Sequence, residues 1–140
     1  MEIHVCSTQK EHLEQVLRLL NNDLSEFLPA NEDFDEIWKQ FSSQGNVHSV
    51  VALVDDFVVG YGAVVLETKI RGGKRGHIED IVSHRHFRNC GVGSSIVAHL
   101  YNLAVGKGCY KVALQCKYHN VEFYEKCGFL KSGFGLHRFN

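Results

Sequence analysis

The sequence predicts a single α/β (α+β) domain over residues 1–140, in which helices flank a mixed central sheet. Three observations lead to this prediction. The chain is long enough for one hydrophobic core and too short for two ordinary domains. Apolar residues make up 44% of it and only one residue is proline, which argues against disorder. Stretches with helical periodicity alternate with valine-rich runs typical of strands.

The first third of the chain is expected to contain one strand and two helices. Residues 3–6 (IHVC) alternate apolar and polar side chains, as a short strand does. Thr8 and Glu11 have the spacing of a capping box, and a second helix follows the polar segment 21–31. Each helix carries an apolar stripe that we expect to face the core. The stripes are Leu13, Val16, Leu17 and Leu20, and then Phe34, Ile37, Trp38 and Phe41.

The middle of the chain predicts most of the sheet. Two valine-rich runs, residues 47–54 and 57–67, flank an Asp55-Asp56 turn and should form a hairpin. A basic loop then leads into a third strand at residues 76–83 (GHIEDIVS).

The last third completes the order β-α-α-β-β-β-α-β-α-β. Residues 93–105 have a helical apolar face, and Gly106 and Gly108 should end that helix. The remaining predicted elements are a strand at 109–116, a short helix at 120–126 that Asn120 caps, and a strand at 128–139.

Composition excludes several classes of protein. The net charge of −1 argues against a general nucleic-acid binder, and no apolar run approaches the ~20 residues that span a membrane. The N-terminus lacks the features of a signal peptide, so a cytoplasmic protein is expected. Five cysteines without a C-x-x-C pair suggest free thiols in apolar sites. His84, His86 and Cys90 lie close together in sequence, but no second ligand cluster has zinc spacing, so no metal site is predicted.

The segment Arg88–Ser94 (RNCGVGS) has the pattern of an anion site. It stands between a predicted strand and a predicted helix, where unpaired N–H groups and the helix dipole favour negative charge. Gly91 and Gly93 lack the Cβ atoms that would keep a phosphate away, and both tolerate unusual backbone angles. Arg88 adds a permanent positive charge. A plain tight turn is the alternative interpretation of these residues.

R-x-x-G-x-G resembles the acetyl-CoA pyrophosphate loop, Q/R-x-x-G-x-G/A, of the GNAT N-acetyltransferase superfamily. The stretches GHIEDIVS, GCYKVALQC and NVEFYEKCGF are similar to those of the eukaryotic-type glucosamine 6-phosphate N-acetyltransferases, over about residues 60–130. The resemblance implies the GNAT acyl-CoA N-acyltransferase fold. It also implies acetyl transfer from acetyl-CoA to the amine of D-glucosamine 6-phosphate, a step of UDP-N-acetylglucosamine biosynthesis, with no metal.

The resemblance implies a binding site for acetyl-CoA along the third strand, the glycine loop and the following elements. Asn120 would then both cap its helix and contact the cofactor arm. The positions implied are Ile81, Val82, Ser83, Arg88, Asn89, Cys90, Gly91, Val92, Gly93, Ser94, Gln115, Asn120 and Tyr124.

Glu79 and Asp80 are adjacent carboxylates within a predicted strand. They are either rim residues paired with the basic loop or the lining of a cleft for a cationic amine. In a regular strand they would point to opposite faces, and a bulge would break that alternation and free a backbone N–H for the thioester carbonyl. The family resemblance assigns this pair to the amino sugar.

Tyr124 is the second catalytic candidate. A phenol can donate a proton or a hydrogen bond to the departing thiolate, whereas a Phe-Tyr pair in a short helix is otherwise a packing feature. The resemblance places Phe123 in the core and Tyr124 beside the sulfur of CoA. Cys90 has no adjacent His–Asp pattern, so a covalent acetyl-cysteine is not expected.

The phosphate of the substrate requires cations. The residues Lys69, Arg71, Tyr110, Lys111 and Arg138 are candidates, and the resemblance places Tyr110-Lys111 and the loop Glu67–Ile70 at substrate-binding positions. Gln115 departs from the family, because some relatives carry an acid there. The loop before GHIED is shorter than in some members, and Arg138 is displaced by one residue, which in a strand reverses the face of a side chain.

The resemblance also implies a homodimer whose subunits exchange C-terminal strands. Two other functions remain open. The chain could be a GNAT enzyme that acetylates another small amine or a peptide, or a non-catalytic regulator that binds CoA.

Overall fold

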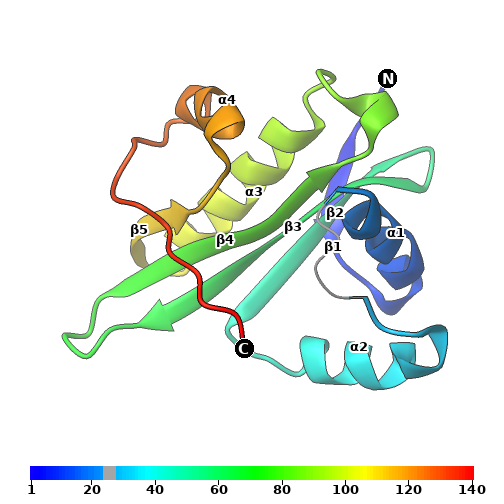
Figure 1. The fold of residues 1–140 in the computed structure, drawn as a ribbon, viewed down its shortest axis with the longest axis horizontal. Helices are drawn as coiled ribbons and strands as arrows, with labels where there is room; N and C mark the ends of the chain where they lie inside the picture. The colour runs from blue at the N-terminus through cyan, green and yellow to red at the C-terminus, as the bar shows by residue number, and fades with distance from the viewer. Residues whose placement is uncertain (24–27) are drawn as a thin grey trace.

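The computed structural model describes residues 1–23 and 28–140, so part of the predicted polar segment 21–31 lies outside the described residues. One five-stranded sheet has the order β1-β2-β3-β4-β5, antiparallel except for the parallel pair β4–β5 (Figure 1). Its strands are β1 (His4–Ser7), β2 (Val47–Val54), β3 (Phe57–Thr68), β4 (Lys74–Ser83) and β5 (Cys109–Leu114). The helices are α1 (Leu13–Asp23), α2 (Phe34–Ser42), α3 (Val92–Gly106) and α4 (Val121–Lys126). The predicted mixed α/β architecture is confirmed.

One face of the sheet is covered by α3 and forms the larger core. Ile96 and Leu100 of α3 are completely buried against β2, β3 and β4. Gly62 makes this packing possible, because a Cβ there would lie 2.5 Å from Ile81 Cδ1 and 2.7 Å from Ile96 Cγ2. Burial of large aliphatic side chains contributes roughly 1.5–3 kcal/mol each, so this face supplies most of the stability.

The opposite face is covered by α1 over only part of its area. Val16 and Leu19 pack on Val51, Tyr61 and neighbouring residues of the sheet. The predicted stripe is therefore partly wrong, because Leu19 is buried and Leu13, Leu17 and Leu20 are only half-buried.

The predicted capping box at Thr8 and Glu11 is wrong. Thr8 still continues the edge of the sheet, because its N–H donates to the Ser49 carbonyl over 3.1 Å. The chain turns into a short 3-10 helix (Lys10–His12) only afterwards, and the Gln9 N–H donates to His12 Nδ1 over 2.9 Å.

The prediction that the aromatic stripe of α2 belongs to the core is also wrong. Phe34, Ile37, Trp38 and Phe41 are only half-buried and join neither buried cluster. Figure 1 shows α2 below the sheet rather than stacked on it, since α1 already occupies the adjacent sheet face. The Trp38 and Phe41 rings pack on each other instead, 6.2 Å between centroids.

The predicted strand at 128–139 is not formed. Along the described chain, no strand follows α4, and the C-terminal tail (residues 129–140) lies mostly exposed. A strand requires a partner edge for its N–H and C=O groups, and the tail is not hydrogen-bonded to β5 or any other strand. Its large apolar side chains are almost fully exposed: Leu130, Phe134, Leu136 and Phe139.

Candidate active site

The glycine loop between β4 and α3 has the geometry of an anion site. Asn89 and Gly91 both adopt left-handed angles, with φ of 62° and 85°, which turn the chain into the first turn of α3. Gly91 occupies the N-cap position of this 15-residue helix, and a Cβ at Gly91 would approach no atom closer than Ser94 Oγ at 4.0 Å. The space beside Gly91 is therefore open at the N-terminus of α3, where the N–H groups of the first helical turn have no intrahelical acceptor and a phosphate group can bind.

Gly93, the second glycine of the loop, also lies in a close contact between α3 and α4. Its backbone is helical, so the expectation of unusual angles is wrong at this position. The absent side chain permits close packing, since a Cβ there would lie 3.1 Å from Phe123 Cζ and the ring would have to shift. Gly93 therefore lets α4 approach the beginning of α3.

The predicted bulge in β4 is present. Tyr61 pairs with Val82 and Ala63 pairs with Glu79, so two residues of β4 oppose the single residue Gly62. Asp80 has the left-handed backbone conformation of the extra residue in the bulge, with φ of +56°. Because of the bulge, Ile81 joins the core under α3, whereas Glu79 keeps the side opposite α3.

The strands β4 and β5 separate at this bulge. Their last paired residues are Ile78 and Leu114, and β4 continues through Ser83 without β5 beside it. The predicted cofactor positions Ile81, Val82 and Ser83 therefore lie next to a gap between two parallel strands. An extended arm can hydrogen-bond there with the unpaired strand edge.

The sheet surface opposite α3 presents a row of polar side chains. Register places Glu67, Arg75 and Lys111 side by side on β3, β4 and β5, and Glu79 lies four residues farther along β4. His77 stands midway between Arg75 and Glu79. We call this set the polar face: Glu67, Arg75, His77, Glu79 and Lys111.

Glu67 organises the positive end of the polar face. Its Oε1 accepts a hydrogen bond from His77 Nε2 over 2.6 Å and lies 2.9 Å from Lys69 Nζ. Hydrogen bonds from Lys69 and His77 lower the pKa of Glu67 to about 2. Arg75 Nε is 3.9 Å from the same oxygen, and it is buried with no hydrogen-bond partner among the described residues.

Two of the catalytic candidates, Glu79 and Tyr124, have perturbed pKa values. Desolvation and the neighbouring Asp80 raise the pKa of Glu79, and His77 opposes that shift. Burial raises the pKa of Tyr124 to about 12, with smaller contributions from Cys116 and Cys127. Glu79 thus becomes a better proton acceptor than an ordinary glutamate, and Tyr124 keeps its proton.

The expectations for Phe123 and Asn120, which lie near Tyr124 in the sequence, are wrong in part. Phe123 is not a core residue, because it is 37% exposed and covers Gly93. Tyr124 instead packs at the border of the core, edge-on to Phe123 and Phe129 at 4.9 and 6.2 Å. Asn120 stands at the N-cap of α4, but its side chain makes no capping hydrogen bond.

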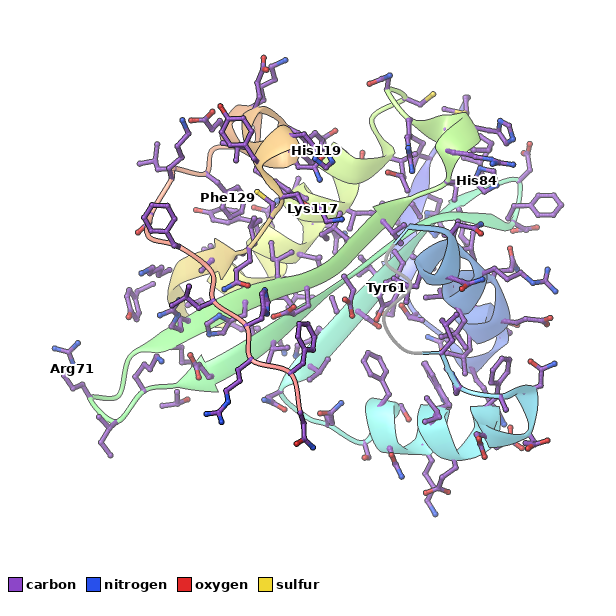
Figure 2. All side chains as sticks on the ribbon, in the orientation of Figure 1. Tyr61, Arg71, His84, Lys117, His119 and Phe129 are labelled. Carbon is purple, nitrogen blue, oxygen red and sulfur yellow. The ribbon has the colours of Figure 1, made fainter. Side chains whose placement is uncertain are left out.

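The predicted phosphate ligands lie at one end of the sheet. Lys111 belongs to the polar face, and Lys69 binds Glu67 at its positive end. Tyr110 covers Gly73, where a Cβ would be 3.1 Å from the tyrosine ring. Figure 2 shows Arg71 at the tip of the β3–β4 hairpin, pointing away from the molecule. Arg138 lies on the exposed tail, which is not part of the sheet.

Gln115 directly follows β5, beside the bulge that carries Glu79 and Asp80. The C-terminal tail passes over it, because a Cβ at Gly135 would lie 3.0 Å from the Gln115 carboxamide. Figure 1 draws the tail in front of β4 and β3, on the side of the sheet opposite α3.

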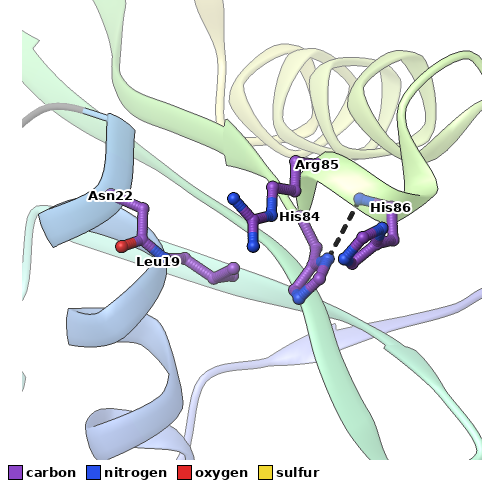
Figure 3. Close-up of a pocket in the computed structure, with 5 residues that line it drawn as sticks. All are labelled: Leu19, Asn22, His84, Arg85 and His86. Carbon is purple, nitrogen blue, oxygen red and sulfur yellow. Dashed lines mark hydrogen bonds between the residues drawn. The ribbon is translucent and has the colours of Figure 1, made fainter.

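Two cavities flank the site. One of about 290 Å³ begins at Ser94 and runs between α3 and α4, with Tyr101 and Lys126 in its wall. The other, of about 130 Å³, lies at the far end of β4 and is lined by Leu19, Asn22, His84, Arg85 and His86 (Figure 3). There the His86 N–H donates to His84 Nδ1 over 3.1 Å. Tyr101, Lys126 and His77 could not be singled out from the sequence, because an isolated polar residue on a helix or strand belongs to no motif.

Other expectations concern cysteines and membranes. All five cysteines are free, but Cys90 and Cys116 are exposed rather than packed in apolar sites. The helices of the described chain include none that is long and apolar enough to cross a bilayer.

The sequence and the fold both match known proteins. The profile of the Acetyltransferase (GNAT) family matches residues 13–129. Glucosamine 6-phosphate N-acetyltransferase from Arabidopsis thaliana is 36% identical over 104 residues, which are 71% of this chain and 70% of that protein. Glucosamine 6-phosphate N-acetyltransferase 1 from Dictyostelium discoideum is 36% identical over 115 residues, 79% of this chain and 73% of that protein.

A solved structure agrees with these relatives. The crystal structure of glucosamine-6-phosphate N-acetyltransferase from Arabidopsis thaliana matches with a TM-score of 0.91 at 27% identity, covering 99% of both chains. The family profile spans most of the chain, and the resemblance seen in the motifs is confirmed. The chain therefore belongs to the Acetyltransferase (GNAT) family, together with the glucosamine 6-phosphate N-acetyltransferases.

Proposed function

We propose that the protein transfers the acetyl group of acetyl-CoA to the amine of D-glucosamine 6-phosphate. The products are N-acetyl-D-glucosamine 6-phosphate and CoA, a step toward UDP-N-acetylglucosamine. The observation that carries this proposal is the polarity of one sheet surface. The polar face has a carboxylate at the bulge and a cluster of cations about 13 Å away along β4. An acceptor with an amine at one end and a phosphate at the other fits that order of charges.

Acetyl-CoA is the proposed co-substrate. The loop Arg88–Ser94 would hold its pyrophosphate at the N-terminus of α3, which fits because Gly91 leaves the N–H groups accessible. The arm would lie along Ile81–Ser83, in the gap where β4 and β5 separate. The cavity between α3 and α4 adjoins the loop at Ser94 and offers Lys126 to the nucleotide end. Gln115 and Asn120 border the same path.

Catalysis would proceed by direct transfer. Glu79, alone or through water, takes a proton from the bound ammonium group, and Asp80 adds negative charge that attracts the cation. The amine lone pair then attacks the thioester carbon, and the C–S bond breaks. Tyr124 donates its proton to the departing thiolate, and the nitrogen of the new amide releases the second proton of the former ammonium group, which returns through water to the Tyr124 phenolate. Holding the two reactants in contact would supply much of the acceleration.

The positive end of the polar face would bind the phosphate. Lys69, Arg75 and Lys111 supply three cations around the single carboxylate of Glu67. The buried, unpartnered Arg75 Nε supports an anion at this position. Tyr110 and Arg138 would complete the set, Arg138 through movement of the exposed tail.

A homodimer is the proposed assembly, with each C-terminal tail placed on the partner subunit. The tail has the apolar pattern of a strand, lacks a sheet partner here and exposes four large apolar side chains. The half-exposed aromatic stripe of α2 supports a second covered surface. In light scattering, the full chain should have twice the mass of 15.8 kDa, and a chain ending at Phe129 should have the single mass. A monomeric full chain would contradict this assembly.

We place the protein in the cytoplasm, which the five free thiols support.

The test of the proposed reaction is release of free thiol from acetyl-CoA in the presence of different amines. Glucosamine 6-phosphate should react much faster than glucosamine, because only the former satisfies the cations of the polar face. Preference for a peptide or an unphosphorylated amine would indicate a GNAT enzyme of another specificity. Absence of release with every amine, combined with calorimetric binding of CoA, would indicate a regulator.

A further inference from the structure

His77 and Glu67 form a cross-strand pair that the acetyl-transfer chemistry does not require. The 2.6 Å bond joins neighbouring strands diagonally, since Glu67 directly opposes Arg75 rather than His77. Both side chains are partly exposed, at 32% and 39%. The pair is therefore accessible to a ligand that lies on the polar face.

Glu67 fixes the orientation of the imidazole. Because the carboxyl group of Glu67 is ionised, it can only accept, and His77 must donate its Nε2–H to it. Lys69 binds the same carboxylate oxygen and so limits the movement of Glu67. The hydrogen bond at Nε2 holds the ring in one orientation, and this orientation fixes the direction in which Nδ1 points.

His77 lies in the middle of the polar face. It stands two residues from Arg75 and two residues from Glu79, about 6.6 Å along the strand in each direction. The side chains beside it are Val65 on β3 and Ala113 on β5, which cannot form hydrogen bonds. Among the described strands, this middle row offers one hydrogen-bonding side chain, that of His77.

We propose that His77, held in place by Glu67, is a specificity-determining residue that hydrogen-bonds a ring hydroxyl of the acceptor between its phosphate and its amine. This inference rests on the proposed function, because an acceptor bound at both ends must pass its ring over the middle row. Glu67 acts as a positioning residue. Its carboxylate binds His77 and leaves substrate contact to the imidazole.

His77→Ala tests the contact directly. The KM for glucosamine 6-phosphate should rise about 3- to 10-fold, the value of one hydrogen bond, while the KM for acetyl-CoA and kcat at saturation stay within about 2-fold. Arg18→Ala is the matched control, because it removes a 2.6 Å ion pair with Glu14 on α1, away from the polar face. An unchanged KM for the acceptor would overturn the proposal, whatever happens to thermal stability.

A double-mutant cycle tests the positioning role. Glu67→Ala should raise the acceptor KM in the wild-type background and have no further effect in the His77→Ala background. Glu67→Gln, which retains an acceptor oxygen, should restore most of the lost affinity. Additive effects of the two alanine substitutions would show that Glu67 acts independently, which would contradict the inferred clamp.

Calorimetry with deoxy analogues separates this inference from the proposed reaction. Wild type should bind one of the two analogues, 3-deoxy- or 4-deoxy-glucosamine 6-phosphate, about 3- to 10-fold more weakly than glucosamine 6-phosphate. His77→Ala should bind that analogue and glucosamine 6-phosphate with equal affinity. Binding is measured without turnover, so the result stands even if thiol release fails. Equal binding of all three compounds by wild type, or discrimination that survives in His77→Ala, would overturn the role of His77.

Discussion

The two faces of the central sheet are built from the same strands but differ in almost every property. The face under α3 is dry and closely packed, and Ile96 and Leu100 have no exposed surface. The opposite face is closely packed under α1, and beyond it the polar face remains partly open. Neighbouring residues of β4, such as Ile78 and Glu79, thus point to the packed core and to the proposed site respectively. A strand can line both because its side chains alternate.

The largest expected effect concerns the packed face. Leu100→Ala should reduce the free energy of unfolding by roughly 2–5 kcal/mol, because it leaves a cavity between α3 and the sheet. Denaturant titration measures this loss. The KM values of the remaining folded enzyme should change little, and a selective loss of acceptor binding would show that the faces are not independent.

Glu79→Gln should produce the reverse pattern. We expect kcat/KM to fall about 100-fold because the amide cannot accept the proton, with a melting temperature close to that of wild type. Since the pKa of Glu79 is raised, wild-type kcat/KM should increase with pH through a value above 4.5. That acidic limb should disappear in the variant. Persistence of the limb would assign it to another group.

Tyr124→Phe should lower kcat about 10- to 100-fold with little change in the affinity for acetyl-CoA. A thiolate is already a good leaving group, so the proton contributes less than Glu79 does. With its pKa at about 12, Tyr124 remains protonated and able to donate throughout the physiological range. Below pH 10, kcat should therefore show no decrease with rising pH that depends on Tyr124. A rise in KM without loss of kcat would contradict its role.

Gly91→Ala should give the smallest of these effects. At φ of +85° an alanine costs about 1–2 kcal/mol, and its Cβ narrows the approach to the helix N-terminus, so CoA binding should weaken about 10-fold. Gly106→Ala is the control within the same helix, since its Cβ would meet nothing within 4 Å. Equal calorimetric affinities for the two variants would argue against the phosphate loop.

The predictable parts of the molecule are those in which local sequence determines the outcome. The strand at residues 47–54 has its predicted bounds, and the hairpin follows from the Asp55-Asp56 turn, where both residues take left-handed angles. The glycine loop was also predictable, because Gly91 is needed for a positive φ. The family motifs indicated the carboxylate pair and Tyr124.

The predictions from the sequence are wrong where contacts between residues distant in sequence determine the structure. The stripe of α2 has the periodicity of a core helix, yet α1 occupies the adjacent sheet surface. The tail has the pattern of a strand but no edge to pair with in one chain. Phe123 was expected in the core, yet it covers Gly93 because α4 packs on the beginning of α3, which no local pattern records.

The sequence by itself determined the order of helices and strands as far as α4, the turn at Asp55-Asp56 and the left-handed glycine at position 91, since each depends on backbone preferences and periodicity within a few residues. Only the tertiary structure decided which face of the sheet carries the row of polar side chains. The bulge at Asp80 keeps Glu79 on the side opposite α3, and strand register brings His77 to Glu67 across the hairpin. Such contacts join residues that are distant in sequence, and pairing between strands alone fixes them.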